Sequence, residues 1–232
     1  MKHFKLFNNE TNYNAWLESA NFVTPYVSKI KSNGNINYQK RLPYDLKIEY
    51  LEATGYQHID TNIIGNGSYR YKIKFICNNM GSYEDGNSAT IFGSRTGPTT
   101  NSIQLSTWHN GCFGYNSLND NLGINTNIEY IVEFKRDNKL YINNEEKLTV
   151  NNLSYNTPNS LILFALHNAD ENIKEHFIGK IYYFTLYDEN DNIILDFVPV
   201  RKNGVGYMYD KVSKQLFGNQ GTGQFILGPD IT

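Results

Sequence analysis

The sequence predicts an all-β domain built as an antiparallel β-sandwich. Strand patterns recur from Tyr44 onward with turn signals between them, and no long helical pattern follows residue 45. The 33 asparagines and 18 tyrosines agree with this, because asparagine favours turns and tyrosine favours strands. A length of 232 residues allows one such domain with a small additional element. We expect that element at residues 1–45 and the sandwich at residues 46–232.

Residues 1–45 predict a small α+β element. A cap at Asn9, Thr11 or Asn12 precedes four apolar side chains at the spacing of one helix face: Tyr13, Trp16, Leu17 and Ala20. Thr24-Pro25 ends this helix, because the residue before proline avoids helical backbone. An extended segment and a turn at Asn33-Gly34-Asn35 then predict a small hairpin.

About 40 residues bury little core alone, so this element needs a partner surface. That surface is another protein chain, a second copy, or the main domain. We expect an interface with another chain, formed by five side chains: Tyr13, Trp16, Leu17, Val23 and Tyr26. Packing within the chain is the alternative.

Alternating side chains identify the strands of the larger domain in order. One face of the first strand carries Tyr69, Tyr71, Ile73, Phe75 and Cys77. A strand is expected at Ile103–Thr107, and another has Ile128, Tyr130, Val132 and Phe134 opposed to Glu129, Glu133 and Lys135. Residues 140–142 and 147–150 flank a turn and predict a hairpin, followed by the apolar run Leu161–Leu166.

The segment Phe177–Tyr187 is apolar on both faces, which predicts a strand in the middle of the sandwich. The alternation puts Phe177, Ile181, Tyr183 and Tyr187 on one face and Ile178, Tyr182, Phe184 and Leu186 on the other. A turn at Asp188–Asn192 leads to a strand at Ile193–Val198.

Three glycines close to the C-terminus, Gly218, Gly221 and Gly223, raise the question of a phosphate-binding loop. They neither follow a strand and open a helix nor precede a Lys-Ser/Thr pair, so nucleotide-binding motifs are excluded. We expect a turn that leads into a terminal strand at Gln224–Leu227.

Charge and composition exclude several classes of protein. The net charge of −2 gives no electrostatic reason to expect nucleic acid or an anionic membrane as a partner. No apolar run is long enough for a signal-peptide core or a membrane span, so we expect synthesis in the cytoplasm. Cys77 and Cys112 make neither a disulfide framework nor a zinc site, and buried thiols are expected.

The motif Leu51-Glu52-Ala53-Thr54-Gly55, followed by Gln57-x-Ile59-Asp60-Thr61, resembles the first strand of a known domain family. It is similar to the concanavalin A-like, laminin-G-like jelly-roll domain that is abundant in bacteriophages and prophages of gut bacteria. Further matching segments are Phe92–Arg95, Gly179–Tyr183, Asp196–Lys202, Gly204–Asp210 and Phe217–Asp230. The resemblance covers about residues 46–232 and implies a concanavalin A-like antiparallel β-sandwich.

The N-terminal motifs resemble the leader of virion proteins of crAss-like and other Bacteroidales phages. They are Phe4-Lys5-Leu6-Phe7-Asn8, Tyr13-Asn14-Ala15-Trp16 and Val23-Thr24-Pro25-x-Val27-Ser28. This resemblance implies attachment through residues 1–45 to other virion proteins of the capsid or tail. Synthesis in the host cytoplasm and display on the virion surface follow from it, and analogy with fibres favours a homotrimer.

Concanavalin A-like folds host both lectins and glycosidases, so side chains must decide between them. The Glu-x-Asp-x-x-Glu pattern of the family's enzymes is absent. Glu129 and Glu133 share a strand face but have the pattern of solvated, outward carboxylates. We therefore expect a protein that is not an enzyme.

Aromatic rings stack on sugars, and asparagine amides bind hydroxyl groups, which selects the candidate glycan contacts. The first choices are Trp108, His109, Asn110 and Tyr115, and the second choices are Tyr83, Asp85 and Arg95. Packing of Trp108 on the core is the alternative. His167 and His176 flank the acidic loop Asn168–Glu175, where Asp170 and Glu171 suggest calcium, but a solvated loop without a cofactor or metal is favoured.

These observations predict a bacteriophage structural protein: a head fibre, a capsid decoration or a tail-fibre component. Its jelly-roll domain would bind glycans of the host surface or of mucus, and repeated copies would raise avidity. A carbohydrate-active enzyme or a cellular carbohydrate-binding module is the alternative. A decoration domain without a ligand is a third interpretation.

Overall fold

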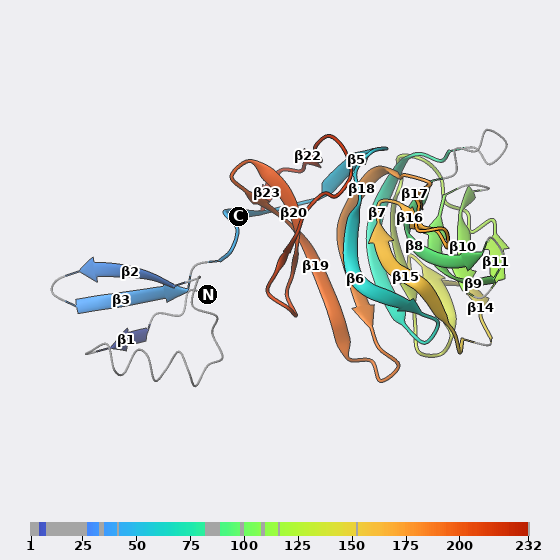
Figure 1. Ribbon diagram of the computed structural model, residues 1–232, viewed down its shortest axis with the longest axis horizontal. Coiled ribbons are helices and arrows are strands. Elements are labelled where there is room, and N and C mark those ends of the chain that lie inside the picture. Colours follow the sequence, from blue (N-terminus) through green and yellow to red (C-terminus); the bar gives the residue numbers. More distant parts are fainter. Residues whose placement is uncertain are drawn as a thin grey trace. The chain divides into compact units, whose positions relative to one another are not determined.

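The computed structural model describes the backbone of residues 5–7, 27–32, 35–40, 42–81, 89–97, 100–107, 110–115, 117–151 and 153–231 (Figure 1). Side chains are described from residue 42 onward within these ranges, except at 117–120. The chain divides into two compact units, Met1–Asp45 and Leu46–Thr232.

The first unit contains a three-stranded antiparallel sheet in the order β1-β3-β2. Its strands are β1 (Lys5–Phe7), β2 (Val27–Ser32) and β3 (Asn35–Lys40). Ser32 pairs with Asn35, so the predicted hairpin is confirmed. The predicted helix and the expected interface residues Tyr13, Trp16, Leu17, Val23 and Tyr26 lie outside the described residues.

The second unit contains two sheets (Figure 1). The eight-stranded sheet consists of β6 (Ile59–Asn66), β8 (Thr90–Gly97), β9 (Thr100–Ser106), β10 (Cys112–Tyr115), β11 (Ser117–Asp120), β15 (Asn156–Leu163), β16 (Leu166–His167) and β17 (Ile173–Lys174). Its main path runs β11-β10-β9-β8-β15-β6, with β16 beside β8 and β17 beside β16.

The twelve-stranded sheet has the main path β14-β13-β12-β7-β18-β19-β20-β21. The strands of this path are β7 (Arg70–Asn79), β12 (Glu129–Phe134), β13 (Lys139–Ile142), β14 (Glu145–Thr149), β18 (Ile178–Tyr187), β19 (Ile193–Lys202), β20 (Val205–Asp210) and β21 (Leu216–Phe217). Four short strands extend it: β4 (Leu46–Ile48), β5 (Leu51–Thr54), β22 (Ile226–Leu227) and β23 (Asp230–Ile231).

Aromatic pairs join the inner faces of the two sheets. The Tyr71 ring in β7 lies 4.7 Å from the Phe92 ring in β8, and the Tyr115 ring in β10 lies 4.6 Å from the Phe134 ring in β12. All four side chains are almost fully buried. Ring contacts of this kind add to the hydrophobic stabilisation from the buried area, so these pairs hold the sandwich together.

Strand alternation is confirmed along β7, where Tyr71, Ile73, Phe75 and Cys77 are all buried. The β13–β14 hairpin is also confirmed, with a two-residue turn at Asn143-Asn144 in which both residues have positive φ. Ile128 is wrong as a member of the inner face of β12, because it lies before the strand and is 48% exposed.

The central position of β18 is confirmed, since it pairs with β7, β19 and β5. Its predicted faces are wrong at one point. A bulge lies between Ile181 and Tyr183, so Ile181 and Phe184 both join the core while Tyr182 and Tyr183 do not. The extra residue reverses the alternation, which a repeat of two cannot anticipate.

The glycine-rich segment is confirmed as a turn that leads into a strand, but this strand spans only Ile226–Leu227 of the predicted Gln224–Leu227, and β23 follows it as the last strand. Gln220 N and Thr222 N donate to the carbonyl groups of His58 and Tyr56, and β22 pairs with β5. A side chain at Gly221 would overlap the Tyr56 carbonyl oxygen, so glycine is required by this close approach.

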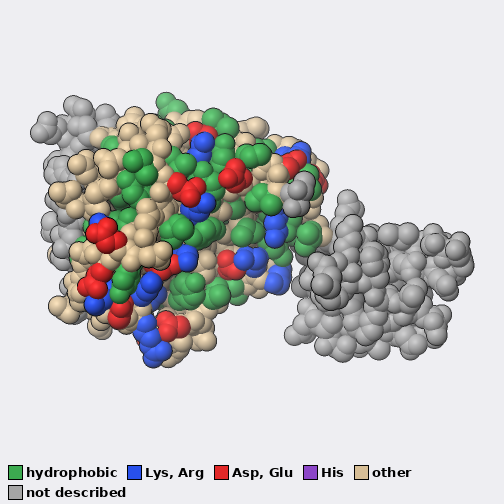
Figure 2. Space-filling view, turned by 180° about the vertical axis from the view of Figure 1, so that it is seen from behind, with side chains coloured by type: hydrophobic (Ala, Val, Ile, Leu, Met, Phe, Trp, Pro, Cys, Tyr) green, Lys and Arg blue, Asp and Glu red, His purple; other side chains and the backbone are tan. Residues whose placement is uncertain are grey.

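Positive and negative side chains lie close together among hydrophobic ones over the face in Figure 2. Cys77 and Cys112 are buried thiols without a disulfide, and burial raises the pKa of Cys77 to about 11. Within the residues that the structure describes, no helix is long and apolar enough to span a membrane.

Candidate functional site

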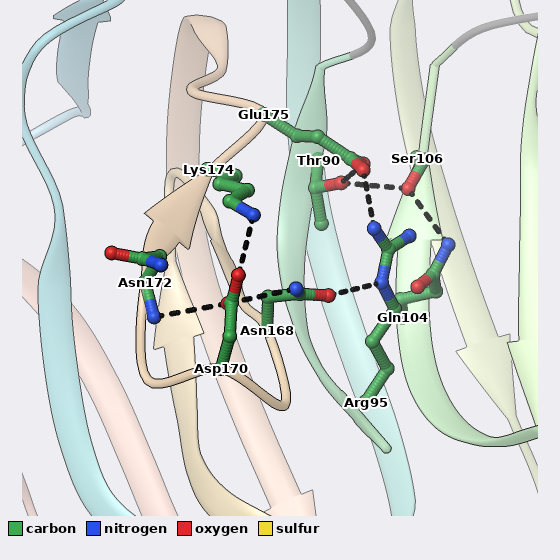
Figure 3. A network of polar contacts seen from close by, with 9 residues as sticks. All are labelled: Thr90, Arg95, Gln104, Ser106, Asn168, Asp170, Asn172, Lys174 and Glu175. Atoms are coloured by element: carbon green, nitrogen blue, oxygen red, sulfur yellow. Dashed lines mark hydrogen bonds and ion pairs between the residues drawn. The ribbon is translucent and has the colours of Figure 1, made fainter. Parts of the chain in front are cut away.

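A polar cluster lies on the outer face of the eight-stranded sheet, opposite the core (Figure 3). We call it the Arg95 cluster, and its members are Thr90, Arg95, Gln104, Ser106, Asn168, Asp170, Asn172, Lys174 and Glu175. It joins β8, β9 and the hairpin formed by β16 and β17, including the residue directly after β17.

Strand alternation sends the β8 and β9 members to this face. Phe92 faces the core, so its neighbour Gly93 and the paired residue Gln104 face outward. Gly93 has no side chain, and the Leu166 methyl group lies only 2.9 Å from where a Cβ would stand. The absence of a side chain at Gly93 therefore lets the β16–β17 hairpin pack directly against the sheet.

Arg95 and Glu175 form the charged centre of the cluster. The Arg95 Nη2 atom lies 3.0 Å from Glu175 Oε1, and each side chain is only 14% exposed. Arg95 Nε donates to Asn168 Oδ1 at 2.8 Å. A largely buried ion pair with additional hydrogen bonds fixes both side chains in one orientation.

A chain of hydrogen bonds runs from Glu175 into the sheet. Thr90 Oγ1 donates to Glu175 Oε2 at 2.8 Å, and Ser106 Oγ lies 2.8 Å from Thr90 Oγ1. Because a carboxylate only accepts and Thr90 has one hydroxyl proton, Ser106 must donate to Thr90. Gln104 Nε2 approaches Ser106 Oγ at 3.4 Å and completes the chain.

Two buried polar atoms on this face, Gln104 Oε1 and Ser102 Oγ, have no hydrogen-bond partner among the described residues. Leaving a buried polar atom unsatisfied costs about 1–3 kcal/mol, so a hydrogen bond to either atom from water or another group would be favourable.

The turn of the β16–β17 hairpin forms an exposed polar rim. Asp170 Oδ2 lies 2.7 Å from Lys174 Nζ, and Asp170 Oδ1 accepts from Asn168 Nδ2 at 2.8 Å. The Lys174 contact and these hydrogen bonds hold the pKa of Asp170 well below its usual range. Asp170, Asn172 and Lys174 are exposed, so the rim presents fixed polar groups to solvent.

The β16–β17 hairpin contains the loop for which the sequence suggested calcium binding as an alternative. His167 Nδ1 lies 3.1 Å from the Ser160 carbonyl oxygen, and the His176 ring lies against His58. Asp170 is ion-paired and Glu171 is exposed. In the described part of the chain, no three His, Cys, Asp or Glu side chains are arranged to hold a metal ion.

The residues that were predicted to contact a glycan lie in different environments. Arg95 lies in the cluster, and Asn110 is exposed with a φ of 62°. Tyr115 is wrong as a glycan contact: it is fully buried, stacks on Phe113 at 4.8 Å and donates its hydroxyl to the Tyr69 carbonyl oxygen. Its position on the inner face of β10 explains the burial.

Trp108, His109, Tyr83 and Asp85 lie outside the described residues. Ala89 is the first described residue after Asp85, and Thr107 is the last one before Trp108. These two residues are neighbours, because Thr107 N donates to the Ala89 carbonyl oxygen at 2.8 Å. The next residue of β8, Thr90, pairs with Ser106 of β9.

Most members of the cluster, including Thr90, Gln104, Ser106 and Glu175, were not predicted as site residues from the sequence. One signal was present: polar residues at every second position of β9, namely Ser102, Gln104 and Ser106. Such a run predicts a strand with one polar face, but it does not say that this face is buried.

The two carboxylates considered for catalysis lie elsewhere, on the outer face of the twelve-stranded sheet. Glu129 lies 3.0 Å from Lys74, and Glu133 contacts Lys72 and lies 3.1 Å from Lys135. Partial burial would raise the pKa of Glu133, but hydrogen bonds from the two lysines outweigh it and lower that pKa. A general acid needs a raised pKa, so Glu133 is not suited to that role.

No protein-family model matches the chain, and no curated protein matches it. A solved structure does: the crystal structure of a candidate carbohydrate-binding protein from Bacteroides ovatus. The two are 10% identical with a TM-score of 0.52, over 97% of this chain and 86% of the other. This likeness concerns the fold, and with the two packed sheets it confirms the prediction of an all-β antiparallel β-sandwich.

Proposed function

We propose that this protein is a bacteriophage virion protein that binds glycans through the outer face of its eight-stranded sheet. The observation that carries the glycan-binding part is the Arg95 cluster, where a fixed ion pair supports an exposed rim of amide, carboxylate and ammonium groups. The fold shared with a candidate carbohydrate-binding protein supports the same class of ligand.

The rim suits the recognition of sugar hydroxyl groups. Each hydroxyl both donates and accepts, so it pairs with a carboxylate or amide oxygen on one side and an N–H group on the other. Asp170 and Lys174 are already aligned at 2.7 Å, and the β16–β17 hairpin holds them in place. Fixed polar groups lose little conformational entropy on binding, which favours this site over a mobile loop. The proposed role is binding without catalysis.

A glycan array with the full chain tests this part, using Arg95→Gln, Lys174→Gln and Trp108→Ala. We expect the Arg95 and Trp108 variants to lose at least about tenfold in affinity, and the exposed Lys174 variant to lose a few-fold. Arg201→Gln is the matched control, because it removes an arginine that is ion-paired to Asp230 on the other sheet. The absence of any bound glycan, or equal losses for Arg95→Gln and Arg201→Gln, would overturn the assignment.

The virion part of the proposal rests on the N-terminal motifs, with residues 1–45 as the attachment element. The protein would be a head fibre, a capsid decoration or a tail-fibre component, attached to other capsid or tail proteins. Mass spectrometry of purified particles tests it, with copy number measured against the major capsid protein. Hundreds of copies would indicate a head decoration and a few tens a tail component, whereas absence from particles would refute the virion role.

A further inference from the structure

A cavity lies at one end of the twelve-stranded sheet, apart from the Arg95 cluster on the other sheet. It has a volume of about 360 Å³ and is lined by the start of β7, the end of β12 and the turn after β18. We call it the Arg70 groove. Small-molecule sites in proteins have volumes of about 300–1,000 Å³, so one or two sugar units fit here.

The Arg70 groove has an excess of positive charge although the whole chain is slightly negative. Four cations line it, namely Arg70, Lys72, Lys135 and Arg136, against the two carboxylates of Glu133 and Asp191. Lys72 and Lys135 share the single Glu133 carboxylate, and Arg136 lies 3.2 Å from Asp191. Two positive charges therefore remain without a matching carboxylate in the groove.

Arg70 carries one of these charges. Its Nη1 atom donates to the Ser68 and Tyr69 carbonyl oxygens at 2.7 and 2.9 Å, and its Nη2 atom donates to Asn138 Oδ1 at 2.6 Å. Its acceptors among the described residues are all neutral, and its Nε atom is buried without a partner. Burial lowers the pKa of Arg70, as expected for a partly desolvated cation.

The partly exposed ring of Tyr187 forms the apolar wall of the same groove. The Arg70 guanidinium lies 4.7 Å from the centre of the Phe134 ring, which is itself buried in the core. Tyr187 is half-buried. Sugar rings stack on such aromatic surfaces through their C–H faces, while cations beside the ring select an anionic substituent.

A polar cleft of about 600 Å³ adjoins the groove and shares Arg70 with it. Asn66, Asn138, Asn156 and Tyr155 are among its lining residues. Amide groups of this kind bind neutral hydroxyl groups. Arg70 thus lies between a cationic groove and a polar cleft in which Glu189 is the one lining carboxylate.

We propose that the Arg70 groove binds an anionic sugar unit, bearing a carboxylate or a sulfate, and that the adjoining cleft takes neutral units of the same oligosaccharide. This inference rests on the proposed glycan binding, but it places a second site on the opposite sheet and defines the chemical class of its ligand. The positive excess of the groove favours the anion, and the Tyr187 wall and the amide groups of the cleft favour a saccharide over a simple ion.

Isothermal titration of the full chain tests this proposal with three probes: a trisaccharide of galacturonic acid, its methyl ester, and a sulfated galactan oligosaccharide. We expect the acid or the sulfated probe to bind at least about tenfold more tightly than the ester, and more weakly at high salt. The double variant Lys135→Gln/Arg136→Gln should lose about tenfold for the charged probe, because both cations are exposed at the rim. The preferred charged probe distinguishes carboxylate from sulfate.

Lys139→Gln/Lys147→Gln is the matched control, since it removes two charges from neighbouring strands outside the groove. Binding of the ester as tight as that of both charged probes, equal losses in both double variants, or no binding of either charged probe would overturn the proposal. Equally tight binding of a DNA duplex, lost in the same variant, would also overturn it by revealing a general polyanion surface. Arg95→Gln should lower the affinity for the neutral glycan found on the array at least about tenfold and leave the affinity for the charged probe unchanged, so failure of the two proposals can be told apart.

Discussion

His58 and His176 face each other with ring centroids 5.8 Å apart, and the buried Nδ1 atom of each has no hydrogen-bond partner among the described residues. Burial lowers the pKa of both side chains. The charge of His176 lowers the pKa of His58 further, and Asp60 offsets part of this effect. The folded protein therefore favours the neutral form of both rings.

Stability should consequently fall in acid. The unfolded chain takes up protons below a pH of about 6.5, whereas the folded chain resists protonation until the pH reaches the lowered pKa. We expect the urea midpoint to drop as pH falls from about 6.5, and the His58→Gln/His176→Gln variant to show a smaller drop. An identical pH dependence in both proteins would show that other groups control acid stability.

Gly221 is a second position where one residue decides local structure. A methyl group there would overlap the Tyr56 carbonyl oxygen, which accepts the hydrogen bond from Thr222 N. Gly221→Ala should lower stability by about 1–3 kcal/mol in chemical unfolding, because backbone must move. Gln220→Ala, an exposed change in the same loop, should cost under about 0.5 kcal/mol. Equal effects would mean that the loop can shift freely.

Among the elements, the β16–β17 hairpin shows best what sequence analysis could not find. Each of its strands has only two residues, too short for alternation to be visible. Its turn nevertheless has the same geometry as the predicted turn at Asp188–Asn192. In both turns the N–H group of the first residue donates to the carbonyl oxygen of the fifth. The fourth residue, Glu171 or Asp191, has a φ of 62° in each. The turn chemistry was visible in the sequence, but the packing of the hairpin on the sheet was not.

The Arg95–Glu175 ion pair ties this hairpin to β8. Arg95→Met should destabilise the protein by about 2–3 kcal/mol, because Glu175 would keep a largely buried charge without its cation. Adding Glu175→Leu should recover part of that loss. Arg201→Met, at an exposed pair, should cost under about 1 kcal/mol by the same urea titration. A similar small cost for Arg95→Met would show that the pair does not anchor the hairpin.

Over the whole molecule, sequence patterns identified the sandwich and most of its strands, because burial of one face imposes a repeat of two. The patterns failed where geometry is not periodic, as at the β18 bulge beside Tyr182. They also could not separate Arg95, which lies in the polar cluster, from Tyr115, which lies in the core. Arginine and tyrosine both occur in sugar-binding sites, so residue type alone did not show that Arg95 and Tyr115 lie on opposite faces of one sheet.

Among the described side chains, the core cluster runs from Ile48 to Phe225, within the larger unit. Residues 46–232 alone should therefore fold with a melting temperature within a few degrees of the full chain. Light scattering should find this fragment monomeric and the full chain trimeric, as the proposed role of residues 1–45 requires. A trimeric fragment, or a monomeric full chain, would remove that role from the N-terminal element.

The most direct test of glycan binding at the Arg95 cluster is hydrogen–deuterium exchange of the full chain with its tightest neutral glycan from the array. We expect slower exchange in peptides that cover residues 89–107 and 166–176, with little change in β12, β13 and β14. Protection confined to other strands, or no protection at saturating glycan, would contradict it.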